Sequence, residues 1–223
     1  MSKTREIPYP ELGSVHKEIR FPDAPLIFSF SGLGDAFEFK GTLDELKVNV
    51  VYIRDLKHRW YLDGIAGIGE DVQSICFYLK QLILEIKPTK TIALGASAGG
   101  FAAMLYGGLL RLDKVLVFSP QTFMDSFHRT IYYDYRWKDN AKKIRGSKSF
   151  NSKYLDVKHT VKTFKGKVNI YYDKKHRLDL LHGYRIRGKN VTRVTEFNGG
   201  HNLVKYLKEE GKLLPIIKNY IFD

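Results

Sequence analysis

A serine lies at the centre of a glycine-rich segment in which residues 95–100 read Gly-Ala-Ser-Ala-Gly-Gly. The segment follows an apolar run that we expect to be a strand, and it opens a helical segment. A sharp turn from strand to helix brings backbone segments close together and therefore requires small residues around the serine. Such a turn exposes the Ser97 hydroxyl at a helix N-terminus, where amides stabilise negative charge. We predict that Ser97 is a nucleophile; the alternative is a structural glycine-rich turn.

A serine hydroxyl needs a base to become a nucleophile, and the base needs a carboxylate to orient it. In sites of this kind the chain order is serine, acid, histidine. Among seven histidines, His201 follows the last predicted strand and two glycines that permit a tight return loop. The alternative for His201 is a role in capping the last helix.

Two aspartates follow the preceding predicted strand, Asp173 at its end and Asp179 six residues later. Asp179 can start a helix and direct its carboxylate back across the ends of the strands, so we favour it as the acid. Asp173 remains the alternative, because a carboxylate directly after a strand also makes local turn hydrogen bonds.

Acyl transfer also needs hydrogen-bond donors for the oxyanion of the tetrahedral intermediate, each worth ~3 kcal/mol. One candidate is the amide of Ala98, directly after the predicted nucleophile. The others are the amides of Gly32 and Leu33, in a glycine-containing loop after the first strong predicted strand. The alternative for that loop is a plain turn.

Short apolar runs rich in β-branched and aromatic residues alternate along the chain with segments of helical periodicity. The predicted strands are residues 26–30, 48–52, 91–94, 115–118, 168–172 and 192–197, and the predicted helices are residues 72–86, 100–110 and 203–207, the last continuing towards Tyr220. This alternation predicts an α/β fold, with a mostly parallel central sheet and helices on both faces.

Residues 120–165 interrupt the alternation, because aromatic and cationic side chains occur there without a strong period. We interpret this segment as a basic cap-like insertion over one end of the sheet. A chain of 223 residues suits one sizeable domain. We therefore predict a single domain over residues 1–223 that includes the cap.

The charge is concentrated in one part of the chain. The net charge is +13, and residues 129–193 contain 19 Lys and Arg against 5 Asp and Glu, so they hold the whole excess. This segment should attract anionic partners. Cys76 is the single cysteine, which excludes an intrachain disulfide and a cysteine-based zinc site, and we predict no metal centre. No signal segment or ~20-residue apolar span is visible, so we expect a cytoplasmic protein.

The chain resembles proteins of the α/β-hydrolase fold, and over residues 25–212 it resembles the compact type found with bacterial surface-polysaccharide genes. The motifs that carry the resemblance are Phe-Ser-Phe-Ser-Gly at 28–32, Arg-Asp at 54–55 with Trp-Tyr at 60–61 and Gly64, Gly-Ala-Ser-Ala-Gly-Gly-Phe at 95–101, Phe-Ser-Pro-Gln at 118–121 and Gly-Gly-His-Asn-Leu-Val at 199–204. The chain is small for the fold, and we expect the segment before Pro25 to be a short arm or an edge strand.

The resemblance implies that Ser97 is the nucleophile, His201 the general base and acid, and Asp179 its orienting partner. Some capsule-modifying members are O-acetyltransferases that use acetyl-CoA, which implies an acyl donor and a sugar hydroxyl as acceptor. No permanently bound cofactor is expected.

The sequence therefore predicts a serine-dependent O-acetyltransferase or esterase that acts on an anionic surface polysaccharide. Its candidate substrate contacts are Arg54, Trp60, Tyr61, His128 and Arg136. The alternative is a non-catalytic protein of the same fold that binds a polyanion or a glycosyltransferase. The sequence contains no recognised nucleic-acid module, so nucleic acid is not an expected partner. The sugar, the acyl group, the choice between hydrolysis and transfer and the oligomeric state stay open.

Overall fold

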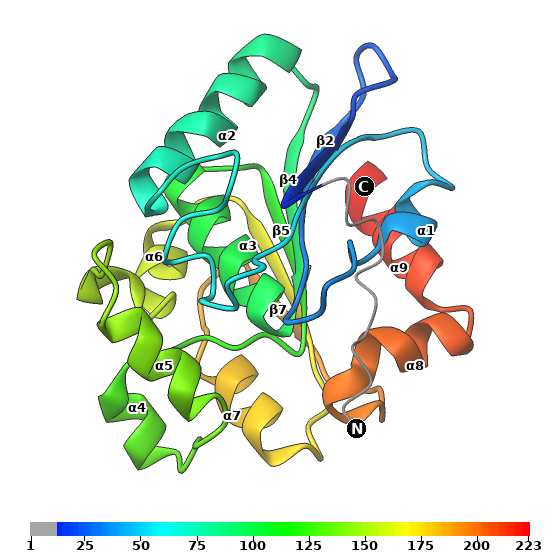
Figure 1. Ribbon diagram of the computed structural model, residues 1–223. Helices are drawn as coiled ribbons and strands as arrows, with labels where there is room; N and C mark the ends of the chain where they lie inside the picture. The colour runs from blue at the N-terminus through cyan, green and yellow to red at the C-terminus, as the bar shows by residue number, and fades with distance from the viewer. Residues whose placement is uncertain (1–12) are drawn as a thin grey trace, which may run out of the picture.

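A computed structural model describes residues 13–223, and a seven-stranded sheet forms its centre (Figure 1). The strands are β1 (Val15–Glu18), β2 (Leu26–Phe30), β3 (Asn49–Ile53), β4 (Thr91–Ala96), β5 (Lys114–Phe118), β6 (Lys167–Tyr171) and β7 (Val191–Val194). Their order is β1-β3-β2-β4-β5-β6-β7, and among these strands only β1 runs antiparallel to its neighbour. All residues of β2, β3 and β5 are buried, as expected for parallel strands that are covered on both faces.

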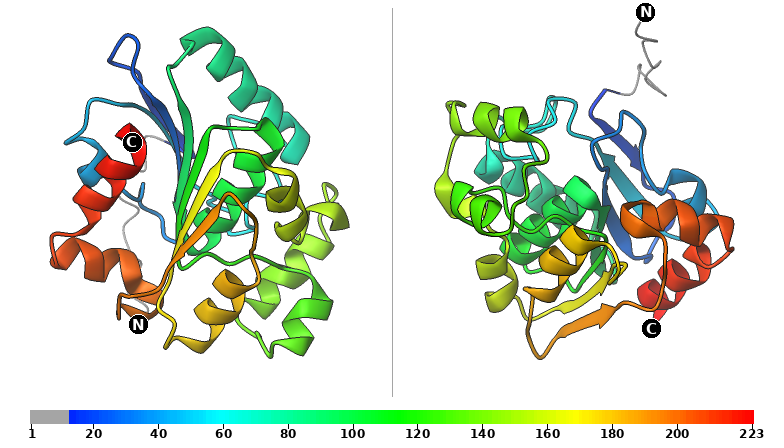
Figure 2. Two further views of the ribbon diagram at one scale, coloured as in Figure 1. Left: turned by 180° about the vertical axis from the view of Figure 1, so that it is seen from behind. Right: turned by 90° about the horizontal axis from the view of Figure 1, so that it is seen from below.

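Helices cover both faces of the sheet (Figure 2). They are α1 (Lys40–Leu43), α2 (Val72–Ile86), α3 (Ser97–Leu110), α4 (Ser126–Ile131), α5 (Lys138–Arg145), α6 (Lys158–Thr163), α7 (Arg177–Tyr184), α8 (Leu203–Glu209) and α9 (Leu213–Phe222). One hydrophobic core packs α2, α3 and α6 against the sheet, and a second packs α8 and α9 against the other face. The protein therefore has three layers, and α4, α5 and α7 lie towards the lower end in Figure 1.

The predicted alternation of strands and helices is confirmed, with small shifts at the ends of the elements. The prediction for α2 is exact, while α3 begins at Ser97, three residues earlier than predicted. The last predicted helix is divided into α8 and α9 at Gly211, whose φ of +66° ends the first of them. The segment before Pro25 contains β1, which is an edge strand.

Residues 120–165 are more regular than their sequence suggests, because they contain α4, α5, a short 3₁₀ turn at Ser152–Tyr154 and α6. The two helices α4 and α6 have 6 residues each and α5 has 8, so none is long enough to show a clear hydrophobic period. Within residues 13–223, no helix has both the length and the apolar composition to cross a bilayer.

The helix α3 crosses the sheet at very close range, and this crossing places the glycine-rich segment at the carboxyl end of β4. A Cβ atom on Gly99 would lie 2.1 Å from the Phe30 carbonyl oxygen, and one on Gly95 would lie 2.2 Å from the Gly99 carbonyl oxygen. Side chains are excluded at both positions. Because parallel strands end at the same edge, the segments after β4, β6 and β7 meet there.

Candidate active site

Ser97 is the first residue of α3 and has a left-handed backbone conformation, with φ of +51°. A residue other than glycine adopts this conformation at a cost of roughly 1–2 kcal/mol. The preceding residue, Ala96, is extended, so the chain turns sharply from strand to helix at the serine. The strained turn leaves Ser97 partly exposed between buried neighbours, as expected for a serine that must meet a second molecule.

The structure brings Ser97, His201 and Asp179 into one hydrogen-bonded chain. Ser97 Oγ lies 3.0 Å from His201 Nε2, and His201 Nδ1 lies 2.8 Å from Asp179 Oδ1 and 3.1 Å from Oδ2. Asp179 is almost fully buried, whereas the His201 side chain is 30% exposed. A carboxylate next to Nδ1 holds the imidazole proton on that nitrogen, so Nε2 presents a lone pair to the serine hydroxyl.

Asp173, the alternative acid, does not contact the His201 ring and binds the loop that carries it instead. Its Oδ2 accepts a hydrogen bond of 2.9 Å from the Gly200 amide, and its Oδ1 accepts one of 2.8 Å from the Lys175 amide. Gly200 directly precedes His201 and has φ of +56°. Asp173 therefore fixes the backbone of the histidine loop, while Asp179 contacts the imidazole itself.

The helix α7 carries Asp179 and is held by the segment between α4 and α5. Arg136 donates two hydrogen bonds of 2.9 Å to Asp134, and its Nη1 lies 3.9 Å from Asp179 Oδ1. Asp134 also lies 3.0 Å from Nε2 of His182, which is on α7. Burial raises the pKa of Asp134, but hydrogen bonds from His182 and Arg136 outweigh it and lower that pKa overall, so its carboxylate stays ionised.

His182 is buried and uncharged. Its burial lowers its pKa, and its Nδ1 accepts a hydrogen bond of 2.9 Å from the Thr122 amide. The imidazole proton therefore sits on Nε2 and is donated to Asp134. This buried contact joins residues 120–165 to the helix that carries Asp179.

The three candidate oxyanion donors differ in their partners. Among the described residues, the amides of Ala98 and Leu33 have no hydrogen-bond acceptor. The Gly32 amide instead donates a hydrogen bond of 3.0 Å to Glu38 Oε2. The amides of Ala98 and Leu33 are therefore the two candidates that can donate hydrogen bonds to an oxyanion without losing an existing bond.

Glu38 is a residue of this region that sequence analysis did not identify. Burial raises its pKa to about 7, although the Gly32 amide and the charge of His201 oppose the shift. The Glu38 amide donates to Ser31 Oγ, so the side chain and backbone of Glu38 both brace the loop after β2. No sequence pattern marks this carboxyl, since it becomes buried only when the loop folds over the strand ends.

Three predicted substrate contacts, Arg54, Trp60 and Tyr61, are fully buried. Arg54 donates to the carbonyls of Gly13 and Asp35, Trp60 Nε1 donates to the Gln121 side chain, and Tyr61 donates to the Ser31 carbonyl. These side chains support the loops around Ser97, so we no longer assign them as substrate contacts.

The other two predicted contacts are partly exposed, and both belong to ion-pair networks. His128 Nδ1 lies 2.8 Å from Asp125 Oδ2, and its Nε2 lies 3.1 Å from Arg185. His128 is therefore not among the side chains that contact Ser97, Asp179 or His201. Arg136 lies beside Asp179, so it remains next to the site.

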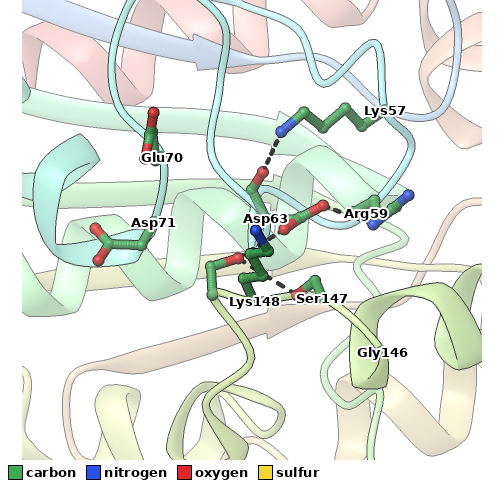
Figure 3. A pocket seen from close by; sticks show the side chains of 9 residues that line it. Lys57, Arg59, Asp63, Glu70, Asp71, Gly146, Ser147 and Lys148 are labelled. Carbon is green, nitrogen blue, oxygen red and sulfur yellow. Dashed lines mark hydrogen bonds and ion pairs between the residues drawn. The ribbon is translucent and has the colours of Figure 1, made fainter.

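A polar cavity of about 600 Å³ lies between residues 57–71 and 146–149 (Figure 3). Several of its polar groups bind one another, because Asp63 pairs with Arg59 at 2.6 Å, accepts a hydrogen bond of 2.6 Å from Ser149 and binds Lys57 through its carbonyl. Ser97, Asp179 and His201 do not line it. We therefore interpret it as the junction that fastens residues 146–149 to the loop before α2.

Comparison with known proteins identifies the fold, although no protein-family model and no curated protein sequence matches the chain. The capsule O-acetyltransferase of Neisseria meningitidis serogroup A matches with a TM-score of 0.64 and 16% identity, over 92% of this chain and 90% of that one. A variant of the same protein in complex with CoA matches with a TM-score of 0.64 and 16% identity, over 90% of each chain. A lipase-esterase related protein from Clostridium acetobutylicum matches with a TM-score of 0.59 and 17% identity, over 94% of this chain and 100% of that one. These matches confirm the predicted α/β-hydrolase fold.

We predict that Glu38→Gln stabilises the protein at pH 8 and leaves its stability nearly unchanged at pH 5. The folded protein retains the Glu38 proton up to a pKa of about 7, whereas the unfolded chain loses it near ~4.3. The protonated carboxyl therefore contributes its full share of stability below pH ~4.3. As the pH rises through about 7 this share is lost, and the free energy of unfolding falls by up to ~3 kcal/mol. Urea unfolding of both proteins between pH 5 and pH 8 measures this difference.

The matched control is Glu85→Gln, which neutralises an exposed carboxylate on α2. Its effect on the free energy of unfolding should vary little with pH. A difference between Glu38→Gln and the wild type that stays constant from pH 5 to pH 8 would contradict the assignment.

Proposed function

We propose that the protein is a serine-dependent acyl-transfer enzyme in which Ser97 is the nucleophile, His201 the general base and acid, and Asp179 the carboxylate that orients His201. The observation that carries this proposal is the continuous contact from Ser97 Oγ to His201 Nε2 and from His201 Nδ1 to Asp179. Nucleophile, base and orienting acid have the distances that nucleophilic catalysis requires.

The proposed reaction begins when Ser97 Oγ attacks an acyl carbonyl and its proton passes to His201 Nε2. The carbonyl oxygen becomes an oxyanion, which the amides of Ala98 and Leu33 stabilise. His201 then gives the proton to the leaving group, and the acyl group stays on Ser97. A hydroxyl group of an acceptor, or water, resolves this ester with His201 again taking the proton.

For the substrates, we propose an acetyl group from acetyl-CoA and a hydroxyl of an anionic surface polysaccharide. The similar Neisseria protein is a capsule O-acetyltransferase, and one of its structures is a complex with CoA. In this scheme acetyl-CoA is a consumed donor and not a permanent cofactor. Esterase activity on an acetylated polysaccharide uses the same residues with water as the acceptor, and a cytoplasmic location would supply CoA.

The basic segment of residues 129–193 supports the anionic acceptor. Its side chains Tyr133, Tyr135 and Trp137 are exposed, cations flank Trp137 on both sides in the chain, and Lys142 and Lys143 are exposed on α5. Arg136 lies between Tyr135 and Trp137 in the chain, and its Nη1 lies 3.9 Å from Asp179 Oδ1. We propose that residues 120–165 act as a cap whose cationic and aromatic surface leads an anionic glycan towards Ser97.

We expect a fluorophosphonate probe to label the wild-type protein and to leave Ser97→Ala unlabelled, since only an activated serine reacts at a useful rate. Labelling is read by intact-protein mass spectrometry. The control is Ser126→Ala, which removes another serine at the first position of a helix, α4, and should be labelled like the wild type. A wild-type protein that stays unlabelled beside a reactive serine hydrolase would favour the non-catalytic alternative.

We expect Asp179→Asn to lower turnover of a model acetyl ester by about 10³–10⁴-fold, because the amide favours the wrong tautomer of His201. Asp173→Asn weakens one bond to the histidine loop and should cost less than about tenfold. Steady-state kinetics of the two variants measures the contrast. The opposite order of effects would transfer the acid role to Asp173.

We expect acetylation of an anionic polysaccharide to fall roughly tenfold between low and high salt, while hydrolysis of a small uncharged ester stays constant. Lys142→Glu combined with Lys143→Glu should reproduce the loss at low salt, and Lys80→Glu on α2 is the matched control. Mass spectrometry of the glycan and of released CoA separates transfer from hydrolysis. If polysaccharide turnover changed neither with salt nor with the double substitution, the cap would be excluded as the binding surface for the polysaccharide.

A further inference from the structure

A second imidazole lies against the carboxylate that contacts His201. His176 is the N-cap of α7, and its Nδ1 lies 3.2 Å from Asp179 Oδ1. The rings of His176 and His201 are 5.7 Å apart between centroids. One ligand atom from each of His176, Asp179 and His201 lies within 4.8 Å of the other two.

This arrangement favours a bound cation. His176 Nδ1 accepts only a long hydrogen bond, of 3.3 Å, from the Asp179 amide and lies 3.2 Å from an anionic oxygen of Asp179, so a cation at this nitrogen would replace a weak bond. A positive charge beside this nitrogen and this oxygen would be stabilised by both of them. Arg136 fills this role only in part, because its Nε and Nη2 bind Asp134 and its Nη1 lies 3.9 Å from Asp179, the long limit of an ion pair.

We propose that His176, Asp179 and His201 form a binding site for a zinc ion, and that the bound ion inhibits the reaction. Two imidazole nitrogens and one carboxylate oxygen match the ligands that Zn²⁺ prefers, and water can take a fourth position. Ligand atoms at ~2.0–2.2 Å from a tetrahedral zinc lie roughly 3.3 Å from one another. The contacts of Asp179 with the two imidazoles, at 3.2 and 2.8 Å, are near this spacing.

The ion can reach this site from solvent. The His176 and His201 side chains are 36% and 30% exposed, whereas Asp179 is 1% exposed and forms the inner wall.

Inhibition follows from the tautomer of His201 and rests on the proposed function. Zinc binds the Nδ1 lone pair, so the ring proton that faced Asp179 must move to Nε2. Nε2 then presents an N–H group to Ser97 Oγ and cannot accept its proton. The zinc ion and the catalytic proton transfer therefore exclude each other.

A second cluster of similar composition is less suited to bind a metal ion than the cluster of His176, Asp179 and His201. Asp125, His128 and Asp156 also place ligand atoms within 4.8 Å of one another. Arg185, however, makes two hydrogen bonds of 2.7 Å to Asp156 and contacts His128 at 3.1 Å. A guanidinium already neutralises that cluster, so a metal ion would have to displace it.

The test is calorimetric titration of untagged, full-length protein with Zn²⁺ alone, in a buffer that does not bind metals. We expect one zinc ion per wild-type chain and weaker binding to His176→Asn. Asparagine retains an acceptor for the start of α7 but removes the imidazole. Loss of an outer-sphere partner weakens a metal site by roughly 10- to 100-fold, so loss of this ligand should cost more than about tenfold.

Two further variants make the result specific. His159→Asn removes an exposed histidine on α6 and should bind zinc like the wild type. Ser97→Ala should also bind zinc like the wild type. The test of the metal site therefore does not depend on whether the protein has acyl-transfer activity. Mg²⁺, which prefers oxygen ligands, should produce no binding heat.

Inhibition is read as the rate of serine-probe labelling with zinc, relative to the metal-free rate of the same protein. We expect zinc to slow labelling of the wild type, a chelator to restore it, and His176→Asn to resist zinc. Equal zinc affinity in the wild type and His176→Asn would overturn the site. Zinc bound through His176 without any slowing of labelling would overturn the inhibition.

Discussion

The close crossing of α3 over the sheet is the constraint on which the rest of the site depends. The backbone of Gly99 lies against the Phe30 carbonyl, so α3 starts within reach of the loop that follows β2. The same crossing forces Ser97 into a left-handed conformation and places the Ala98 amide beside its hydroxyl. A less intimate contact would move the serine away from the loop after β2, which carries the Leu33 amide. The small residues around Ser97 are therefore required by packing, and this packing in turn gives the serine its position.

The groups around His201 are ordered by two carboxylates with separate tasks. Asp173 binds the backbone of the histidine loop, and Asp179 binds the imidazole. Asp179 depends in turn on α7, which the buried pair of Asp134 and His182 joins to residues 120–165. Removal of either partner of such a buried contact lowers stability strongly, because the other partner is left unpaired in a medium of low polarity. The segment that carries the basic surface is thus mechanically connected to the acid of the site.

The environment of Asp179 also explains how the same side chains could hold either a proton or a metal ion. The carboxylate accepts a hydrogen bond from His201 Nδ1 and lies near His176 and Arg136. A proton between Asp179 and His201 prepares the base, whereas a metal ion in the same place would remove it. On the other side of the serine, Glu38 holds the Gly32 amide, which leaves the amides of Ala98 and Leu33 to meet a developing oxyanion.

The sequence by itself determined the α/β alternation, the glycine-rich turn at Ser97 and the position of His201 after the last strand, because hydrophobic period and glycine spacing are local properties of the chain. Tertiary structure decided which aspartate contacts the imidazole, since the five residues between Asp173 and Asp179 include a turn and the start of α7. It also buried Arg54, Trp60 and Tyr61 and brought Glu38 and His176 to the site. Distances between side chains on separate loops depend on how the ends of the strands and helices pack together, and no local pattern records them.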